Sequence, residues 1–146
     1  MAVAQPACIS VQPADLPGDA AAITRIRRQV FIEEQRVPEE LEWDPDEIAC
    51  DWFVARADSE VVGIVRFLAE GRIGRMAVLP AWRRRGVGSA LMQAVLAHAR
   101  TLGHRQLVLS AQVHAIPFYS RSGFAATGSE YMDAGIPHRT MTLTWC

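Results

Sequence analysis

Apolar residues recur along this chain with a helical period in some segments and as short β-branched runs in others. Helical spacing predicts two longer helices, over residues 15–35 and 86–102, and a shorter one over residues 114–121. Gly103 follows the second of these helices in the manner of a glycine C-cap. We also expect a brief acidic helix after Pro38.

Runs rich in β-branched and aromatic residues, bounded by turn residues, predict seven strands between these helices. The expected strands cover residues 8–12, 51–56, 61–69, 72–79, 106–110, 124–131 and 138–145. The strand at 106–110, QLVLS, is largely apolar, so we expect it to be buried on both faces. The order β-α-α-β-β-β-α-β-α-β-β predicts an α/β fold with a mixed sheet, built as one domain over residues 1–146.

Composition and charge narrow the class of protein. The chain is 50% hydrophobic with a formal net charge of −1, so no overall basic field points to nucleic acid. Cys8, Cys50 and Cys146 are scattered without CxxC spacing, which favours free thiols over a zinc site or a disulfide framework. No apolar run approaches the ~18 residues that span a bilayer, and no secretory signal is recognisable. We therefore expect a cytoplasmic protein that needs no metal and binds neither nucleic acid nor membrane.

The segment AWRRRGVGSALM, residues 81–92, places three arginines and two glycines between a strand and a helix. The first N–H groups of a helix have no partner within it, and the helix dipole adds positive charge there. Glycines let a ligand approach this backbone, and arginines bind phosphate oxygens. The chain has no lysine for a Walker A loop, and Leu91 stands where a Rossmann fingerprint has its third glycine. The pattern therefore predicts a phosphate site of another kind.

Two longer motifs resemble those of a known family. RMAVLPAWRRRGVGSALM is similar to the acetyl-CoA-binding motif of the GNAT superfamily of N-acetyltransferases, [RQ]-x-x-G-x-[GA], with Arg83, Gly86 and Gly88 at its defining positions. QVHAIPFYSRSGF resembles the family's N-x-x-A-x-x-F-Y-x-x-x-G-F, with Gln112 where asparagine is usual. VFIEEQRVPEELEWD and DAGIPHRTM further resemble the small bacterial ElaA-like branch of this family.

The resemblance implies a GNAT fold and direct transfer of an acetyl group from acetyl-CoA to a primary amine through a ternary complex. The pyrophosphate would lie on the N–H groups of residues 84–89. The pantetheine would pair with the backbone of residues 76–78, where the sheet splays from the strand at 106–110, and the Val78 N–H would face the developing oxyanion. The implied acetyl-CoA contacts are Met76, Ala77, Val78, Arg83, Arg84, Arg85, Gly86, Val87, Gly88, Ser89, Gln112, Phe118 and Tyr119.

The catalytic roles follow from the same resemblance. Tyr119 would protonate the departing thiolate, and a base would take a proton from the acceptor ammonium. Glu33, Glu34 and His138 are the candidate bases, with no ranking among them. Tyr119 could instead be a core aromatic, and His138 a hydrogen-bonded turn residue.

Nine acidic residues crowd between positions 33 and 51, with Arg36 as the one opposing charge in the run. Such a run is commonly a solvated face. In a GNAT fold, however, this region borders the acceptor cleft, where it would attract a cationic amine. Its members are Glu33, Glu34, Glu39, Glu40, Glu42, Asp44, Asp46, Glu47 and Asp51.

Two functions from other classes stay open. One is a non-catalytic module that binds or senses acyl-CoA, against which stand only Tyr119 and the acidic run. The other is an RNA-binding surface built on Trp82 and the arginine triplet, which lacks a wider basic stripe. A homodimer is compatible with each function.

Overall fold

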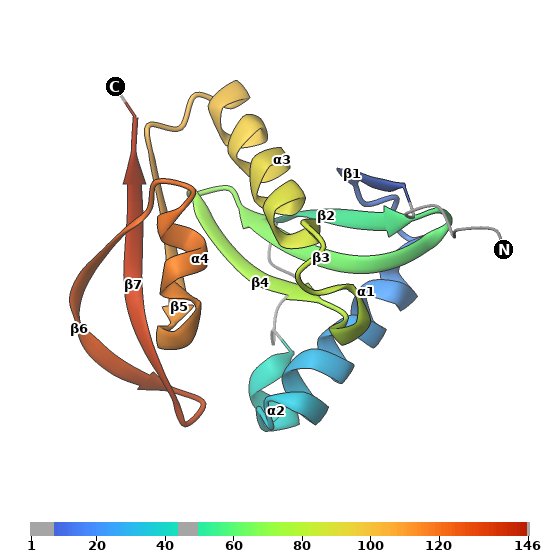
Figure 1. The fold of residues 1–146 in the computed structure, drawn as a ribbon, viewed down its shortest axis with the longest axis horizontal. Helices are drawn as coiled ribbons and strands as arrows, with labels where there is room; N and C mark the ends of the chain where they lie inside the picture. The colour runs from blue at the N-terminus through green and yellow to red at the C-terminus, as the bar shows by residue number, and fades with distance from the viewer. Residues whose placement is uncertain (1–7, 44–49, 146) are drawn as a thin grey trace, which may run out of the picture.

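In the computed structural model, which describes residues 8–43 and 50–145, seven strands form one sheet in the order β1-β2-β3-β4-β5-β7-β6 (Figure 1). Neighbouring strands are antiparallel except β4 and β5, which are parallel. Cys146 and three members of the acidic run, Asp44, Asp46 and Glu47, lie outside the described residues. The strands are β1 (Ile9–Pro13), β2 (Cys50–Ala57), β3 (Glu60–Leu68), β4 (Arg72–Val78), β5 (Gln106–Gln112), β6 (Ala125–Asp133) and β7 (Ile136–Thr144).

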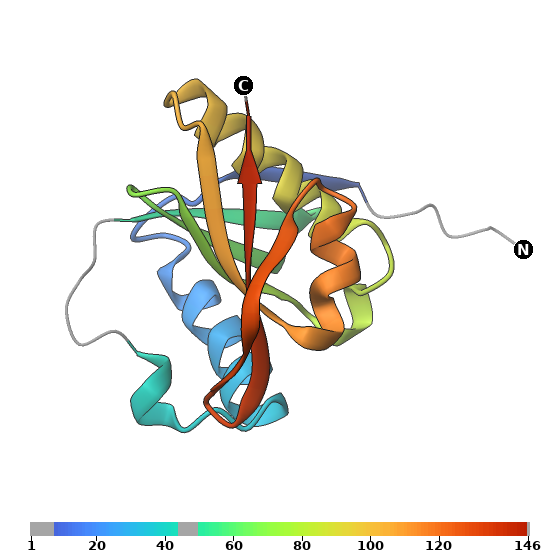
Figure 2. The ribbon, with the colours of Figure 1, turned by 90° about the vertical axis from the view of Figure 1, so that its left-hand side faces the viewer.

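The helices cover both faces of this sheet, with α3 on one face and α1 on the other (Figure 2). Strand β3 supplies both cores: Val62 and Phe67 pack with α3, whereas Ile64 packs with α1. No helix within the described ranges is long and apolar enough to cross a membrane. The helices are α1 (Ala20–Arg27), the π-helical η1 (Arg28–Glu34), α2 (Glu39–Glu42), η2 (Pro80–Trp82), α3 (Val87–Thr101), η3 (Val113–Ala115) and α4 (Ile116–Ser120).

The predicted fold class and element order are confirmed, but the helix expected over residues 15–35 differs in two ways. It begins only at Ala20, because Pro17 and Gly18 hold the preceding residues in turns. After Arg27 it widens into η1, where the Gln35 N–H donates to the Val30 carbonyl at 3.1 Å, five residues back. Such π segments are rare and occur frequently at functional sites.

The prediction that residues 106–110 are buried on both faces is wrong. Leu107 and Leu109 are buried, whereas Gln106 and Ser110 are exposed. Burial alternates along β5, because only the face that carries Leu107 and Leu109 packs in the core with α3. The described pairing of β4 with β5 is limited to Arg72 with Val108 and Ile73 with Leu109. Beyond that point the two strands diverge, as Figure 1 shows, and the predicted splay of the sheet is confirmed.

Candidate active site

A cavity of about 750 Å³ lies where β4 and β5 separate. Its wall is formed by η1, the end of β4, the start of α3, the end of β5, α4 and the turn between β6 and β7. Of the predicted site residues, the wall does not include Glu33 or Arg85, both of which are exposed. It does bring together Glu34, Met76, Ala77, Val78, Arg83, Arg84, Gly86, Val87, Gly88, Ser89, Gln112, Phe118, Tyr119 and His138.

The end of β4 turns backbone groups toward this splay. A bulge, in which two residues of β4 face Val65 of β3, carries Arg75 at a φ of 49°. Past the bulge, the Leu79 N–H donates to the Val62 carbonyl on β3 at 2.9 Å. Successive residues of a strand direct their N–H and C=O groups to opposite edges, so those of Val78 point away from β3. The Val78 N–H therefore faces the opening between β4 and β5.

The start of α3 presents free N–H groups to the same cavity. Gly86 precedes the helix with a φ of 82°, and its carbonyl accepts the first helical bond, from the Ala90 N–H at 3.0 Å. That bond leaves the N–H groups of Val87, Gly88 and Ser89 without a partner inside the helix. With the dipole of a 15-residue helix behind them, these N–H groups suit a phosphate anion.

The three arginines before this helix make different contacts. Arg83 forms a bidentate pair with Glu34, with Nη1 and Nη2 at 2.7 and 2.6 Å from the two carboxylate oxygens, and its Nε donates to the Val78 carbonyl at 3.0 Å. The hydrogen bonds from Arg83 lower the pKa of the Glu34 carboxyl. Arg84 makes no ion pair with any residue of the described ranges, and Arg85 lies over the Trp82 ring at 5.2 Å.

Tyr119 lies on α4 with its ring edge-on to Phe118, at 5.0 Å between centroids. Burial raises the pKa of Tyr119 to about 12, so its hydroxyl stays protonated through the physiological range. The same α4 segment meets α3 closely, because a Cβ on Gly88 would lie 3.2 Å from two atoms of the Phe118 ring.

His138 is buried on β7 and adjoins Gln112 of β5 in the sheet register. Its Nδ1 lies 2.7 Å from the Ile136 carbonyl oxygen, which can only accept, so Nδ1 carries the hydrogen. In the neutral ring Nε2 is then an acceptor, as a base requires. The ring stacks against Tyr131 at 6.1 Å, and the Tyr131 hydroxyl bonds to Ser110.

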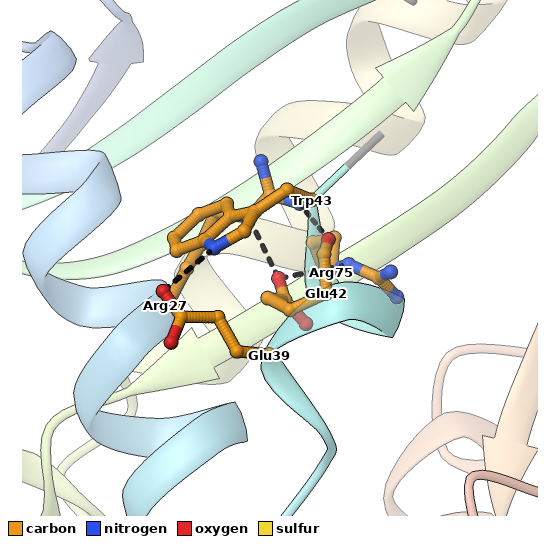
Figure 3. Close-up of polar contacts among 5 residues, drawn as sticks. All are labelled: Arg27, Glu39, Glu42, Trp43 and Arg75. Atoms are coloured by element: carbon orange, nitrogen blue, oxygen red, sulfur yellow. Dashed lines mark hydrogen bonds and ion pairs between the residues drawn. The ribbon is translucent and has the colours of Figure 1, made fainter. Parts of the chain in front are cut away.

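Of the six members of the acidic run that the structure describes, four make ion pairs with basic residues. Glu42 is buried, with its carboxylate 2.7 Å from Arg27 Nε and 3.2 Å from Arg75 Nε (Figure 3). Outside this cluster, Glu39 pairs with Arg28 at 2.9 Å, Glu34 with Arg83, and Asp51 on β2 with His98 on α3 at 3.0 Å. Arg36 is the one opposing charge within the run itself, but the structure adds arginines from outside it, on α1, η1, β4 and the loop before α3.

The wall also contains residues that were not predicted as site residues, among them Gln35 and Arg75. Gln35 accepts a hydrogen bond of 2.8 Å from the Gln112 amide, which gives the longer glutamine side chain a protein partner. Arg75 reaches the wall from the bulge of β4. Gln35 is a polar residue at a helix end, and Arg75 is an arginine within a strand. Both are common in sequences, so the sequence alone does not identify either as a site residue.

Comparisons with known proteins agree with this geometry. The family model described as the acetyltransferase (GNAT) domain matches residues 14–145. The uncharacterized N-acetyltransferase YjcF of Bacillus subtilis is 36% identical over 120 residues, which are 80% of this chain and 86% of that protein. Escherichia coli ElaA has a similar crystal structure, with a TM-score of 0.81, 26% identity, and coverage of 92% of this chain and 99% of that one. An acyl-CoA N-acyltransferase from Pseudomonas aeruginosa gives a TM-score of 0.79, 30% identity, and coverage of 94% and 99%.

Proposed function

Because the chain belongs to the GNAT family and is thus an acetyl-CoA-dependent acetyltransferase, we propose that it transfers the acetyl group directly to a primary amine in a ternary complex. One observation carries this proposal. The open N–H groups at the start of α3 and the outward N–H of Val78 line one cavity, at the place where β4 and β5 part. A donor with a phosphate end and a thioester end can use both.

The donor would lie along this line of backbone groups. Its pyrophosphate would accept hydrogen bonds from the N–H groups of residues 86–89, with Arg84 and Arg85 close by in the sequence. Its pantetheine arm would run beside residues 76–78 and past Phe118, within reach of the Gln112 amide. Acetyl-CoA supplies the activated acetyl group, and the protein supplies its orientation.

The acceptor is a primary amine, which arrives as an ammonium because the pKa of such groups lies near 10. We assign the removal of its proton to His138, directly or through a water, because its Nε2 is an acceptor in the neutral ring and the side chain lies on the cavity wall. Glu34 is less suited to this role, because its ion pair with Arg83 lowers its pKa. Glu33 is exposed and does not line the cavity.

In the transfer itself, the amine nitrogen forms a C–N bond with the acetyl carbon and the C–S bond breaks. The Val78 N–H would donate to the carbonyl oxygen as negative charge develops on it. The sulfur leaves with the electron pair of the broken bond, and the Tyr119 hydroxyl donates to it. The nitrogen loses two protons, one to the base before the attack and one as the amide forms. One of them equals the proton that coenzyme A finally gains, and the other is released to solvent.

An assay of thiol release from acetyl-CoA over a panel of primary amines tests this proposal. The panel includes amino sugars, polyamines, amino acids and peptide amines, and the acetylated product is identified by mass spectrometry. We expect turnover of at least one amine class well above hydrolysis. Binding of acetyl-CoA without turnover of any amine would favour the rival function, a module that senses acyl-CoA.

A further inference from the structure

We propose that Arg83 and Glu34 act together as positioning residues that fix the last residue of β4, so that the Val78 N–H stays aimed at the reacting carbonyl. This inference rests on the proposed function, because it concerns the same transfer step. It gives Arg83, the first residue of the arginine triplet, a role other than phosphate binding.

Three of the five guanidinium N–H groups of Arg83 donate to protein groups. Nε donates to the Val78 carbonyl at 3.0 Å, and Nη1 and Nη2 donate to the two oxygens of Glu34 at 2.7 and 2.6 Å. This fork-to-fork geometry is the strong and orientation-specific form of an arginine–carboxylate contact. All three nitrogens thus already hold a protein oxygen, which fixes the orientation of the guanidinium.

Val78 needs such a contact because one side of it has no neighbouring strand. On the β3 side, the next residue is held by the bond from the Leu79 N–H to the Val62 carbonyl at 2.9 Å. On the other side β5 has already diverged, and the chain turns into η2 at Pro80. The bond from Arg83 therefore holds the open side of Val78, and Glu34 on η1 holds Arg83 in turn.

The ion pair between Arg83 and Glu34 links the loop before α3 to η1, and both segments line the cavity. Side chains of Arg83 and Glu34 are 39% and 41% exposed, and ion pairs with this exposure contribute little to global stability. An orientation role is a better account of a bidentate contact at this place. Arg84 lines the cavity and makes no ion pair within the described ranges, so we expect it to bind the phosphate.

The test measures two quantities, kcat and the affinity for coenzyme A, and compares their changes. The variants are Arg83→Gln, Arg83→Lys and Glu34→Gln. Glutamine is allowed at this position of the family motif, so Arg83→Gln is a mild change. We expect kcat at saturating acetyl-CoA to fall by about tenfold, because a small misplacement of a catalytic donor is costly. The Kd for coenzyme A, measured by calorimetry, should change by less than about threefold, well under the tenfold that 1.4 kcal/mol represents. A weakened Kd with kcat retained would overturn the proposal and make Arg83 a phosphate ligand.

Two further variants sharpen the result. The double variant Arg83→Gln/Glu34→Gln should lose no more activity than Arg83→Gln alone, because residues that act as a unit are not additive. Arg28 lies on η1, as Glu34 does, and forms an exposed ion pair with Glu39 at 2.9 Å. Arg28→Gln removes that pair and should leave kcat and the Kd for coenzyme A unchanged. A loss in Arg28→Gln equal to that in Arg83→Gln would point to general loosening of η1 and contradict the positioning role.

The outcomes also separate this inference from the proposed function. No turnover by the unaltered protein with any amine would overturn the proposed function. Turnover by the unaltered protein with unchanged kcat in all three single variants would overturn only the positioning role. The amide signal of Val78 in NMR spectra gives a readout without substrate: it should shift in Arg83→Gln and stay in place in Arg28→Gln.

Discussion

At the scale of the residue, the hydroxyl of Tyr119 combines an apolar setting with a position on the cavity wall. Burial raises its pKa to about 12, whereas a free thiol of cysteine has a pKa of about 8.5. The difference of roughly 3.5 pKa units corresponds to about 5 kcal/mol against full proton transfer to a thiolate. We therefore propose that Tyr119 donates a hydrogen bond to the departing sulfur and that solvent completes the protonation.

Substitution of Tyr119 by phenylalanine isolates this hydroxyl. The ring and its edge-on contact with Phe118 are kept, so the fold and the affinity for coenzyme A should be nearly unchanged. We expect kcat to fall by at least about tenfold, below the roughly 10²–10⁴-fold typical of general acid catalysis, because solvent can still protonate the sulfur. Steady-state kinetics with the acceptor found in the panel measures the effect. Activity equal to that of the unaltered protein would make Tyr119 a core aromatic with no part in the reaction.

The two motif glycines serve different purposes. A Cβ on Gly86 would meet no atom within 4 Å, but its φ of 82° is strained for other residues. A Cβ on Gly88 would press on Phe118 at 3.2 Å. The sequence pattern predicted open space for a phosphate at both positions. The structure shows open space at Gly86 and a close contact between α3 and α4 at Gly88.

Gly86→Ala should weaken coenzyme A binding by about tenfold or more, because the added methyl projects into the space expected for the pyrophosphate. The strain of a left-handed alanine should also lower the free energy of unfolding by about 1–2 kcal/mol. Gly103→Ala is the matched control, since Gly103 has a φ of 86°, open space around its Cβ and no place on the cavity wall. It should lose similar stability and no affinity. Equal affinities in the two variants, measured by calorimetry, would remove the phosphate site from the start of α3.

At the scale of elements, the buried carboxylate of Glu42 joins three of them. It ties the short helix α2 to Arg27 at the end of α1 and to Arg75 in the bulge of β4. Arg27 also donates to the Glu42 backbone carbonyl at 2.7 Å and lies over the Trp43 ring at 4.9 Å (Figure 3). The bulge of β4, which lies at the cavity edge, is thus held in place by contacts with α1 and α2.

Glu42→Gln should lower the free energy of unfolding by about 3–5 kcal/mol, because it removes a buried carboxylate charge from its ion pairs with Arg27 and Arg75. Denaturant unfolding of the variant measures this loss. Glu39→Gln, in the same short helix but with an exposed partner, should leave the unfolding midpoint almost unchanged. If the two variants unfold alike, the buried cluster does not hold α2 in place.

The helices and strands could be predicted from the sequence where a local pattern, such as helical periodicity or a terminal glycine, determines them. The period of Leu91 and Val95 placed α3, and Gly103 marked its end. The π turn of η1 and the bulge at Arg75 could not be predicted, because both arise from how distant segments meet. The same holds for the ion pair between Glu34 and Arg83, which are 49 residues apart in the sequence.

At the scale of the whole molecule, the charges are more balanced than their order along the chain indicates. The net charge is −1, and four carboxylates of the acidic run pair with basic partners from other elements. The motifs predicted the family, because it follows from short segments, and the place of the donor site stays a prediction. The acceptor's charge does not follow from them, since it depends on which carboxylates stay unpaired, and the extent of the domain, residues 1–146, stays a prediction.

If the acceptor carries net positive charge, kcat/KM should fall as salt is added, because a Debye length of about 8 Å at physiological ionic strength screens long-range attraction. The fall should be modest, since the paired carboxylates contribute little to the field. The control is acetyl-CoA hydrolysis without acceptor at the same salt concentrations. A best substrate that is neutral or anionic, or a rate that rises with salt, would rule out attraction by the acidic run.

The central claim is that acetyl-CoA lies in the splay between β4 and β5 with its phosphates on the start of α3. NMR titration of the labelled protein with coenzyme A tests it most directly, because amide signals report which N–H groups gain a partner. We expect the largest shifts at the N–H groups of Val87, Gly88, Ser89 and Val78. Saturable binding with the largest shifts elsewhere, and with these four signals unmoved, would contradict it.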